Sequence, residues 1–284
     1  MLAPTQATPT VPRADELAAA TQAAVLALAD QLDRGHTEDY LATLACWSRF
    51  HRYSYRNLLL IRAQRPGASR VAGYTTWRRL GRQVARGSKA IWIWAPVVAR
   101  ERDPEDGGEI ERCVGFRPAA VYAAEDLVDI AARPLPSLWR PLPDDVEPLY
   151  RRVAAAIWAS GVQVAEAALP AGVHGRTDGR TIVVAAGLDS RNRLATLLHE
   201  WAHQLAHFGP AAVDRQREQC ELEAESTAYV VLRHLGIEYP FAADYLLTYK
   251  VTPARLWASL AVIAGLTRRM FGALEEAADE VGHE

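Results

Sequence analysis

The chain has 284 residues, of which 50% are hydrophobic and 23% are charged, and its formal net charge is −2 at pH 7. This composition is typical of a folded soluble protein and excludes a fibrous or intrinsically disordered one. The sequence contains no run of about 18 apolar residues, and its N-terminus lacks the basic-then-apolar profile of a signal peptide. We therefore expect a cytoplasmic protein that contacts no membrane and, from its length, forms two domains.

The first half of the chain predicts helices followed by strands. Apolar residues recur at helical spacing, and three helices are expected, over 15–34, about 37–51 and about 54–65. Two strands are expected, at 90–95 and about 112–122. Trp92 and Trp94 are interpreted as core residues of the first strand, because Ile91 and Ile93 leave neither of its faces polar.

A proline-rich segment separates the two halves. Five prolines within 131–148 predict an extended linker, since proline interrupts both helices and central strands. The second half predicts a helix over about 145–160, a strand over 181–185, and helices over about 191–208, over about 218–235 and from Thr252-Pro253 onward. The predicted fold class is α+β with two domains: a disordered tail at 1–14, a mixed α/β domain at 15–130, the linker at 131–148, and a mainly helical domain with a small sheet at 149–284.

The most specific motif is His199-Glu200-Trp201-Ala202-His203, an HExxH sequence on a predicted helix. Residues four apart lie on one helix face, so both imidazoles can bind one ion while the glutamate lies beside them. Zinc in such an open site lowers the pKa of its water toward ~7, and Glu200 would take the proton as general base for attack on a carbonyl. The motif predicts a Zn²⁺-dependent metallopeptidase whose protein or peptide substrate the sequence does not name.

A third metal ligand must come from another helix. His207 cannot complete the same site, because it lies about 12 Å along the helix from His199. Glu221 and Glu225 share one face of the next predicted helix, while Glu223 is turned roughly 160° away from them. In Glu-type zincins the ligand glutamate is followed four residues later by an acid that orients a ligand histidine. We predict Glu221 as the ligand and Glu225 as the orienting acid, with their roles reversed as the alternative.

The segment from 49 to 100 is strongly basic. It contains eleven arginines and one lysine but no acidic residue, a charge of +12 in a chain whose net charge is −2. Such a segment favours a polyanionic partner, and phosphate backbones are the commonest one. Interleaved aromatic residues suit a single strand, whose bases stack on rings while arginines follow the phosphates. A solvated basic face without a ligand is the alternative.

Both halves of the chain resemble the ArdC antirestriction family. In the first half the resemblance is carried by Phe50-His51-Arg52-Tyr53-Ser54-Tyr55-Arg56-Asn57, by the turn from Trp77 to Val84, and by Arg86-Gly87-Ser88-Lys89 before a strand. It implies a single-stranded-DNA-binding domain over 15–130. The basic segment and this resemblance together predict the following nucleic-acid-binding residues: Arg52, Tyr53, Ser54, Arg56, Asn57, Trp77, Arg78, Arg82, Gln83, Arg86 and Lys89.

In the second half, Leu198–His203 and Glu221–Glu225 resemble the zincin-like domain of the same family and, more distantly, ImmA/IrrE-type metallopeptidases. The family implies a metal-bound protein that engages single-stranded DNA on mobile elements and protects incoming DNA from restriction. Three functions follow as expectations. The first is a DNA-binding zinc metallopeptidase, the second a DNA-coating antirestriction protein with a structural, non-proteolytic zinc site, and the third an ImmA-like regulator that cleaves a repressor.

Overall fold

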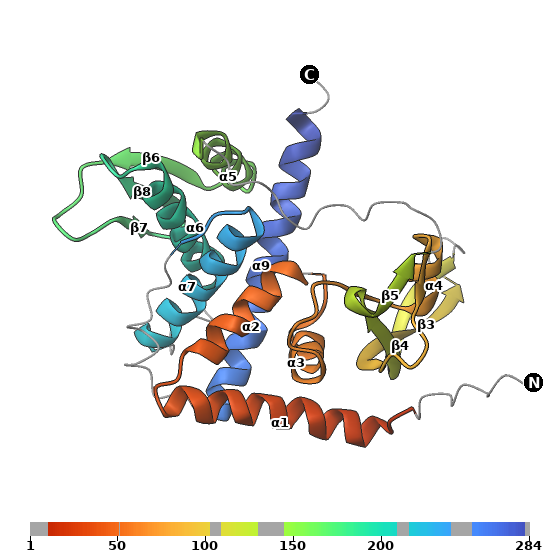
Figure 1. Cartoon of the computed structure of the whole chain (residues 1–284). Coiled ribbons are helices and arrows are strands. Elements are labelled where there is room, and N and C mark those ends of the chain that lie inside the picture. Colours follow the sequence, from red (N-terminus) through yellow and green to blue (C-terminus); the bar gives the residue numbers. More distant parts are fainter. Residues whose placement is uncertain are drawn as a thin grey trace, which may run out of the picture. The chain divides into compact units, whose positions relative to one another are not determined.

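The computed structural model describes residues 11–50, 52–102, 109–129, 145–208, 216–239 and 252–281 (Figure 1). The chain divides into two compact units: unit 1 comprises Met1–Leu26 and Arg56–Pro136, and unit 2 comprises Ala27–Tyr55 and Ser137–Glu284. Most of the predicted tail and most of the predicted linker lie outside the described residues. Helices and strands both contribute substantially, which confirms the mixed α and β character predicted from the sequence.

Residues 27–55 belong to unit 2, which differs from the predicted linear division of the chain near residue 130. Helix α2 (Glu38–Arg49) packs against α7 (Arg217–His234). Tyr40 of α2 is completely buried, and its hydroxyl is hydrogen-bonded to Ser226 Oγ on α7 at 2.8 Å. Periodicity predicts the helix but not the partner of its apolar face, so the sequence could not place α2 in unit 2. Helix α1 (Ala14–Asp33) contributes residues to both units.

Unit 1 is built around antiparallel strands. Its sheet has the order β1-β4-β3, and a separate pair joins β2 to β5. The two predicted strands are the long β3 and β4, whereas β1, β2, β5 and α4 were not predicted because each is six residues or shorter. The elements are α3 (Tyr55–Gln64), β1 (Val71–Ala72), α4 (Tyr74–Arg79), β2 (Arg82–Val84), β3 (Ile91–Arg102), β4 (Glu109–Ala123) and β5 (Leu127–Asp129).

Strand β3 buries Ile91 and Ile93, which are 3% and 5% exposed, while Trp92 and Trp94 are only half-buried. Because successive side chains of a strand point to opposite faces, the isoleucines occupy the core face and the tryptophans the other. The interpretation of the tryptophans as the core residues of this strand was therefore wrong.

Unit 2 contains a small mixed sheet covered by helices. The strand order is β6-β8-β7, with β6 parallel and β7 antiparallel to β8. Helix α6 packs against β7 and β8 on one side and against α7 on another (Figure 1). The elements are α5 (Glu147–Ala159), β6 (Gln163–Ala167), β7 (Gly175–Thr177), β8 (Thr181–Ala185), α6 (Ser190–Ala206), α7 and α9 (Pro253–Val281). No helix in the described part of the chain is long and apolar enough to span a membrane.

Candidate metal centre

Helix α6 presents the HExxH motif toward α7. Asp189 caps the helix, since its carboxylate accepts hydrogen bonds from the backbone N–H groups of Arg191 and Asn192, each at 3.0 Å. Leu198 and Trp201 are 0% and 2% exposed and hold the apolar face of the helix in the core. This packing fixes the rotation of α6 so that its histidines face the next helix.

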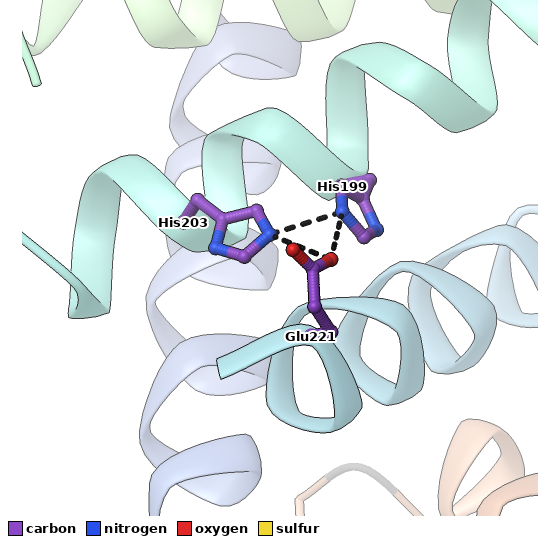
Figure 2. A group of neighbouring side chains, drawn as sticks. All are labelled: His199, His203 and Glu221. Carbon is purple, nitrogen blue, oxygen red and sulfur yellow. Dashed lines mark hydrogen bonds and ion pairs between the residues drawn. The ribbon is translucent and has the colours of Figure 1, made fainter. Parts of the chain in front are cut away.

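His199 and His203 meet Glu221 of α7 in a compact triangle of donor atoms (Figure 2). The two Nε2 atoms are 3.0 Å apart, and Glu221 Oε2 lies 3.3 Å from His199 Nε2 and 3.4 Å from His203 Nε2. A tetrahedral zinc with bonds of about 2.0–2.1 Å requires ligand atoms about 3.3 Å apart. The donor set and its spacing therefore fit a zinc-type ion, and the structure brings together the three ligands predicted from the sequence.

Hydrogen bonds and burial define the charges of these three groups. Burial lowers the pKa of His199, but hydrogen bonds and charges from Glu221 and Glu225 outweigh it and raise this pKa to about 9. Burial lowers the pKa of His203, and the hydrogen bond from His199 and the contact with His203 lower that of Glu221. These shifts favour a carboxylate at Glu221, a neutral His203 and a protonated His199 when no cation is bound, and a cation would displace the proton of His199.

Glu225 lies on the other side of His199 from Glu221. Its Oε2 accepts a hydrogen bond from His199 Nδ1 at 3.2 Å, so it contacts the nitrogen that points away from the triangle. This is the arrangement expected when Glu221 binds the ion and Glu225 orients a ligand histidine. With the roles reversed, Glu225 would have to face the two Nε2 atoms, and in the structure Glu221 does so.

The sequence reasoning missed two residues beside this site, His207 and Glu223. His207 was considered only as a ligand and rejected, and Glu223 was expected only to point away from Glu221 and Glu225. In the structure Glu223 is completely buried and bonds to His207, which in turn contacts His203. The signal that could have found His207 is its position four residues after His203, on the same helix face.

A cleft of ≈ 830 Å³ opens over the triangle, lined by residues of β7, α6 and α7. Glu200 lies on its wall, and burial is the main cause that raises the pKa of this carboxyl to about 6. A carboxylate of raised basicity beside an open metal site suits a proton acceptor that works near neutral pH. The cleft lies entirely within unit 2.

Gly175 of β7 lets the strand approach α6 closely. A Cβ at this position would lie 2.5 Å from Thr196 Cγ2 and 2.8 Å from Glu200 Cγ. We expect Gly175→Ala to lower the free energy of unfolding by about 1–3 kcal/mol, because a stiff β-branched side chain and the backbone-proximal part of Glu200 must move. Urea denaturation measures the change. Gly265→Ala on α9, where nothing lies within 4 Å of the added Cβ, should not destabilise the protein, and equal losses in both variants would contradict the close-approach argument.

Two of the predicted DNA-binding residues are structural. Asn57 is 7% exposed, and its amide donates to Trp94 O and accepts from Trp94 N, both at 2.8 Å. Trp77 is 2% exposed, and its Nε1 donates to Tyr122 O at 2.9 Å. Neither side chain is available to a nucleic acid without opening unit 1. The prediction is corrected for both residues. Asn57 is hydrogen-bonded to the edge of β3, and Trp77 packs in the core.

The remaining predicted DNA-binding residues are divided between the two units. Arg52, Tyr53 and Ser54 belong to unit 2, and the others belong to unit 1. Tyr53, Ser54 and Arg82 are half-buried. The exposed members are Arg52, Arg56, Arg78, Gln83, Arg86 and Lys89.

In comparisons with known proteins, the N-terminal part of the chain matches a family model and the fold resembles solved structures of one protein. Residues 13–122 match the model of the N-terminal domain of anti-restriction factor ArdC. The metal-free crystal structure of antirestriction protein ArdC from plasmid R388 is similar with a TM-score of 0.53 and 17% identity, covering 79% of this chain and 86% of that one. The Mn(II)-bound structure of the same protein gives a TM-score of 0.54 and 17% identity, covering 91% and 97%. At this identity, the similarity shows a shared fold.

A curated relative is an uncharacterized protein of Bacillus anthracis, 25% identical over 253 residues. The match covers 73% of this chain and 43% of the relative. The chain therefore spans less than half of the length of that protein.

Proposed function

Because this chain is an ArdC-like protein, we propose that it binds single-stranded DNA and hydrolyses peptide bonds at a zinc centre. Its residues 13–122 match the N-terminal domain of anti-restriction factor ArdC. The role that fits both activities is protection of incoming mobile-element DNA against restriction. The observation that carries the peptidase part is the triangle of His199, His203 and Glu221 with Glu200 on the wall of the cleft above it. The similar ArdC structure contains Mn(II), which supports the proposal that this chain also binds a divalent cation.

The ion, when bound, supplies positive charge that polarises water and a substrate carbonyl. His199, His203 and Glu221 hold it, and Glu225 keeps the His199 ring oriented through Nδ1. Glu200 accepts the proton of the attacking water and can return it to the leaving amine.

A catalytic rather than a structural site is favoured by the number of ligands. Structural zinc sites are closed by four protein ligands, whereas catalytic sites keep one position open. Among the described residues only three donor groups gather within 4.8 Å of one another, and they border the cleft. This arrangement supports hydrolysis over the non-proteolytic alternative.

The DNA-binding part rests on the exposed basic residues of unit 1. Arg78 lies in the last turn of α4, and Lys89 lies between β2 and β3; both side chains are exposed. No acidic residue occurs between 49 and 100, so an anionic ligand would reduce the repulsion among the arginines of this segment, of which Arg65 and Arg100 are already paired with Asp126 and Glu111. Phosphates of a single strand fit this surface, as in other proteins that follow a nucleic-acid backbone with positive charges.

A salt titration tests this binding. We expect the affinity for a fluorescent single strand to fall steeply as salt rises, and Arg78→Ala and Lys89→Ala each to reduce the slope of log K against log salt by about 1. Arg100→Ala is the matched control, because Arg100 is an exposed arginine of unit 1 that is already paired with Glu111 at 3.3 Å. Binding that does not depend on salt, or an equal change in the control, would contradict the proposed DNA surface.

A further inference from the structure

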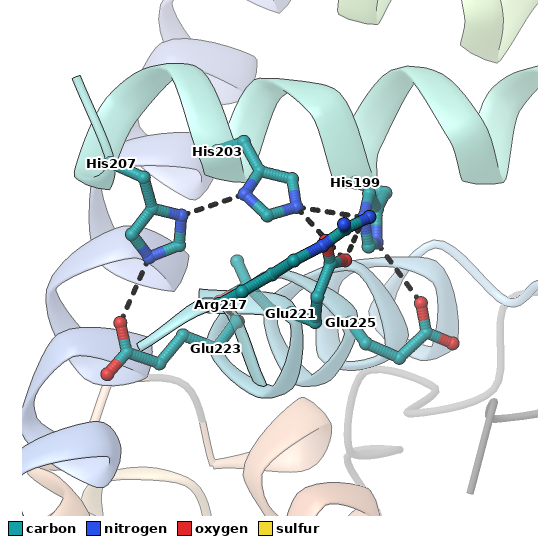
Figure 3. Close-up of polar contacts among 8 residues, drawn as sticks. His199, His203, His207, Arg217, Glu221, Glu223 and Glu225 are labelled. Atoms are coloured by element: carbon teal, nitrogen blue, oxygen red, sulfur yellow. Dashed lines mark hydrogen bonds and ion pairs between the residues drawn. The ribbon is translucent and has the colours of Figure 1, made fainter. Parts of the chain in front are cut away.

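The half-buried His203 and the buried side chains of His207 and Glu223 form a line of hydrogen bonds that leads away from the metal triangle (Figure 3). His203 Nδ1 lies 2.9 Å from His207 Nδ1, and His207 Nε2 lies 3.0 Å from Glu223 Oε2. Glu223 Oε1 also accepts a hydrogen bond from Gln219 Nε2 at 3.0 Å. We call the His203–His207–Glu223 series the relay.

The burial of the relay shows that it is more than a solvated charge beside a helix. Glu223 is 0% exposed, and the side chain of His207 is 6% exposed. A carboxylate removed from water costs several kcal/mol unless hydrogen bonds replace its hydration. His207 and Gln219 supply such bonds to the two oxygens, and Thr227 Oγ1 donates to the backbone carbonyl of Glu223 at 2.7 Å.

The relay has one consistent arrangement of protons when both imidazoles are neutral. A carboxylate can only accept, so His207 must carry its proton on Nε2 and donate it to Glu223. His207 Nδ1 is then an acceptor, and the proton in the next bond must lie on His203 Nδ1. His203 Nε2, which lies 3.0 Å from His199 Nε2 and 3.4 Å from Glu221 Oε2 in the triangle, is then unprotonated, and its lone pair can accept from the His199 N–H or bind an ion. The opposite tautomers would set an unprotonated nitrogen of His207 against the carboxylate.

We propose that His207 and Glu223 are positioning residues that hold His203 in the tautomer whose Nε2 can bind a metal ion. The inference rests on the proposed metal site. It adds a role for two residues that neither bind the ion nor take part in the proposed reaction. It also gives the two histidines different partners: a carboxylate orients His199 directly, and a carboxylate acting through an imidazole orients His203. Removal of a group that orients a ligand histidine typically weakens metal binding by about 10–100-fold.

The first test reads the tautomer in the metal-free protein. Long-range ¹H–¹⁵N NMR of the labelled full chain distinguishes a protonated from an unprotonated imidazole nitrogen. We expect His203 to be protonated on Nδ1 in the wild type and to gain an Nε2-protonated population in His207→Leu. A merely structural role of His207 would not move this signal. An unchanged His203 tautomer in a folded His207→Leu variant overturns the proposal.

The second test measures affinity for Zn²⁺ by competition with a chelator. We expect His207→Leu and Glu223→Leu to bind Zn²⁺ about 10–100-fold more weakly than the wild type. His207→Gln should recover much of the loss, since its amide oxygen can accept from His203 and its NH₂ group can donate to Glu223. His234→Leu is the matched control, because His234 is also a hydrogen-bonded histidine of unit 2, bonded to Ser48 O at 3.1 Å. It lies about 20 Å along α7 from Glu221. Equal weakening in His234→Leu, or no recovery in His207→Gln, overturns the proposal.

The two tests separate this inference from the proposed function. If the wild type binds no Zn²⁺ while the His203 tautomer still depends on His207, the metal site fails and the relay stands as the source of the tautomer. If the wild type binds Zn²⁺ and His207→Leu keeps both the tautomer and the affinity, the relay fails alone. Thermal unfolding of each variant accompanies the tests, and His207→Gln covers the case in which His207→Leu does not fold.

Discussion

Glu200→Gln is expected to lower the turnover of a peptide substrate by about 10²–10⁴-fold, the usual contribution of a general base. Glutamine keeps the shape of the side chain but cannot accept a proton, so water near the triangle is no longer activated. The affinity for Zn²⁺ should stay close to that of the wild type, because Glu200 is not one of the three grouped donors. Turnover of a fluorogenic peptide library and Zn²⁺ competition measure the two quantities.

Glu276→Gln serves as the control for this prediction, since it makes the same change at an exposed position of α9. It should leave both turnover and metal affinity unchanged. If Glu200→Gln keeps full turnover, the general-base role is lost. If the wild type binds Zn²⁺ but hydrolyses none of the peptides, the non-proteolytic antirestriction protein becomes the better account.

The long elements of the fold could be predicted because their patterns are local. The helix that carries His199 and His203, the helix with Glu221, and the strand β8 were all expected close to their observed bounds. Spacing along a helix also predicted which groups share a face, which is why the triangle agrees with the expected ligands. A periodic pattern determines a helix and its apolar face, but it does not specify what packs there, and so the place of α2 in unit 2 was missed.

The sequence-based predictions failed at polar residues that are buried and hydrogen-bonded to other parts of the protein. Asn57 and Trp77 lie in a basic, aromatic segment and were predicted to contact DNA, but their polar groups pair with the backbone of β3 and β4. Glu223 was expected to face away from the site, and it does, yet it faces His207 rather than solvent. Composition and spacing cannot tell a solvated polar group from a buried one whose partner lies on another element.

The second large effect is expected at the third ligand. Glu221→Ala should weaken Zn²⁺ binding by more than about 100-fold, because a loss at the ion should exceed the 10–100-fold typical of groups that only orient a ligand. Glu225→Gln should stay within that smaller range, since Glu225 contacts only His199 Nδ1, at 3.2 Å. Zn²⁺ competition on both variants compares them directly, and Glu218→Gln, at an exposed position in the first turn of α7, controls for the charge lost near the site. If Glu225→Gln weakens binding more than Glu221→Ala does, the roles of the two acids are reversed. If neither variant binds Zn²⁺ more weakly than the control, the ion does not occupy the triangle, and the peptidase proposal loses the observation on which it rests.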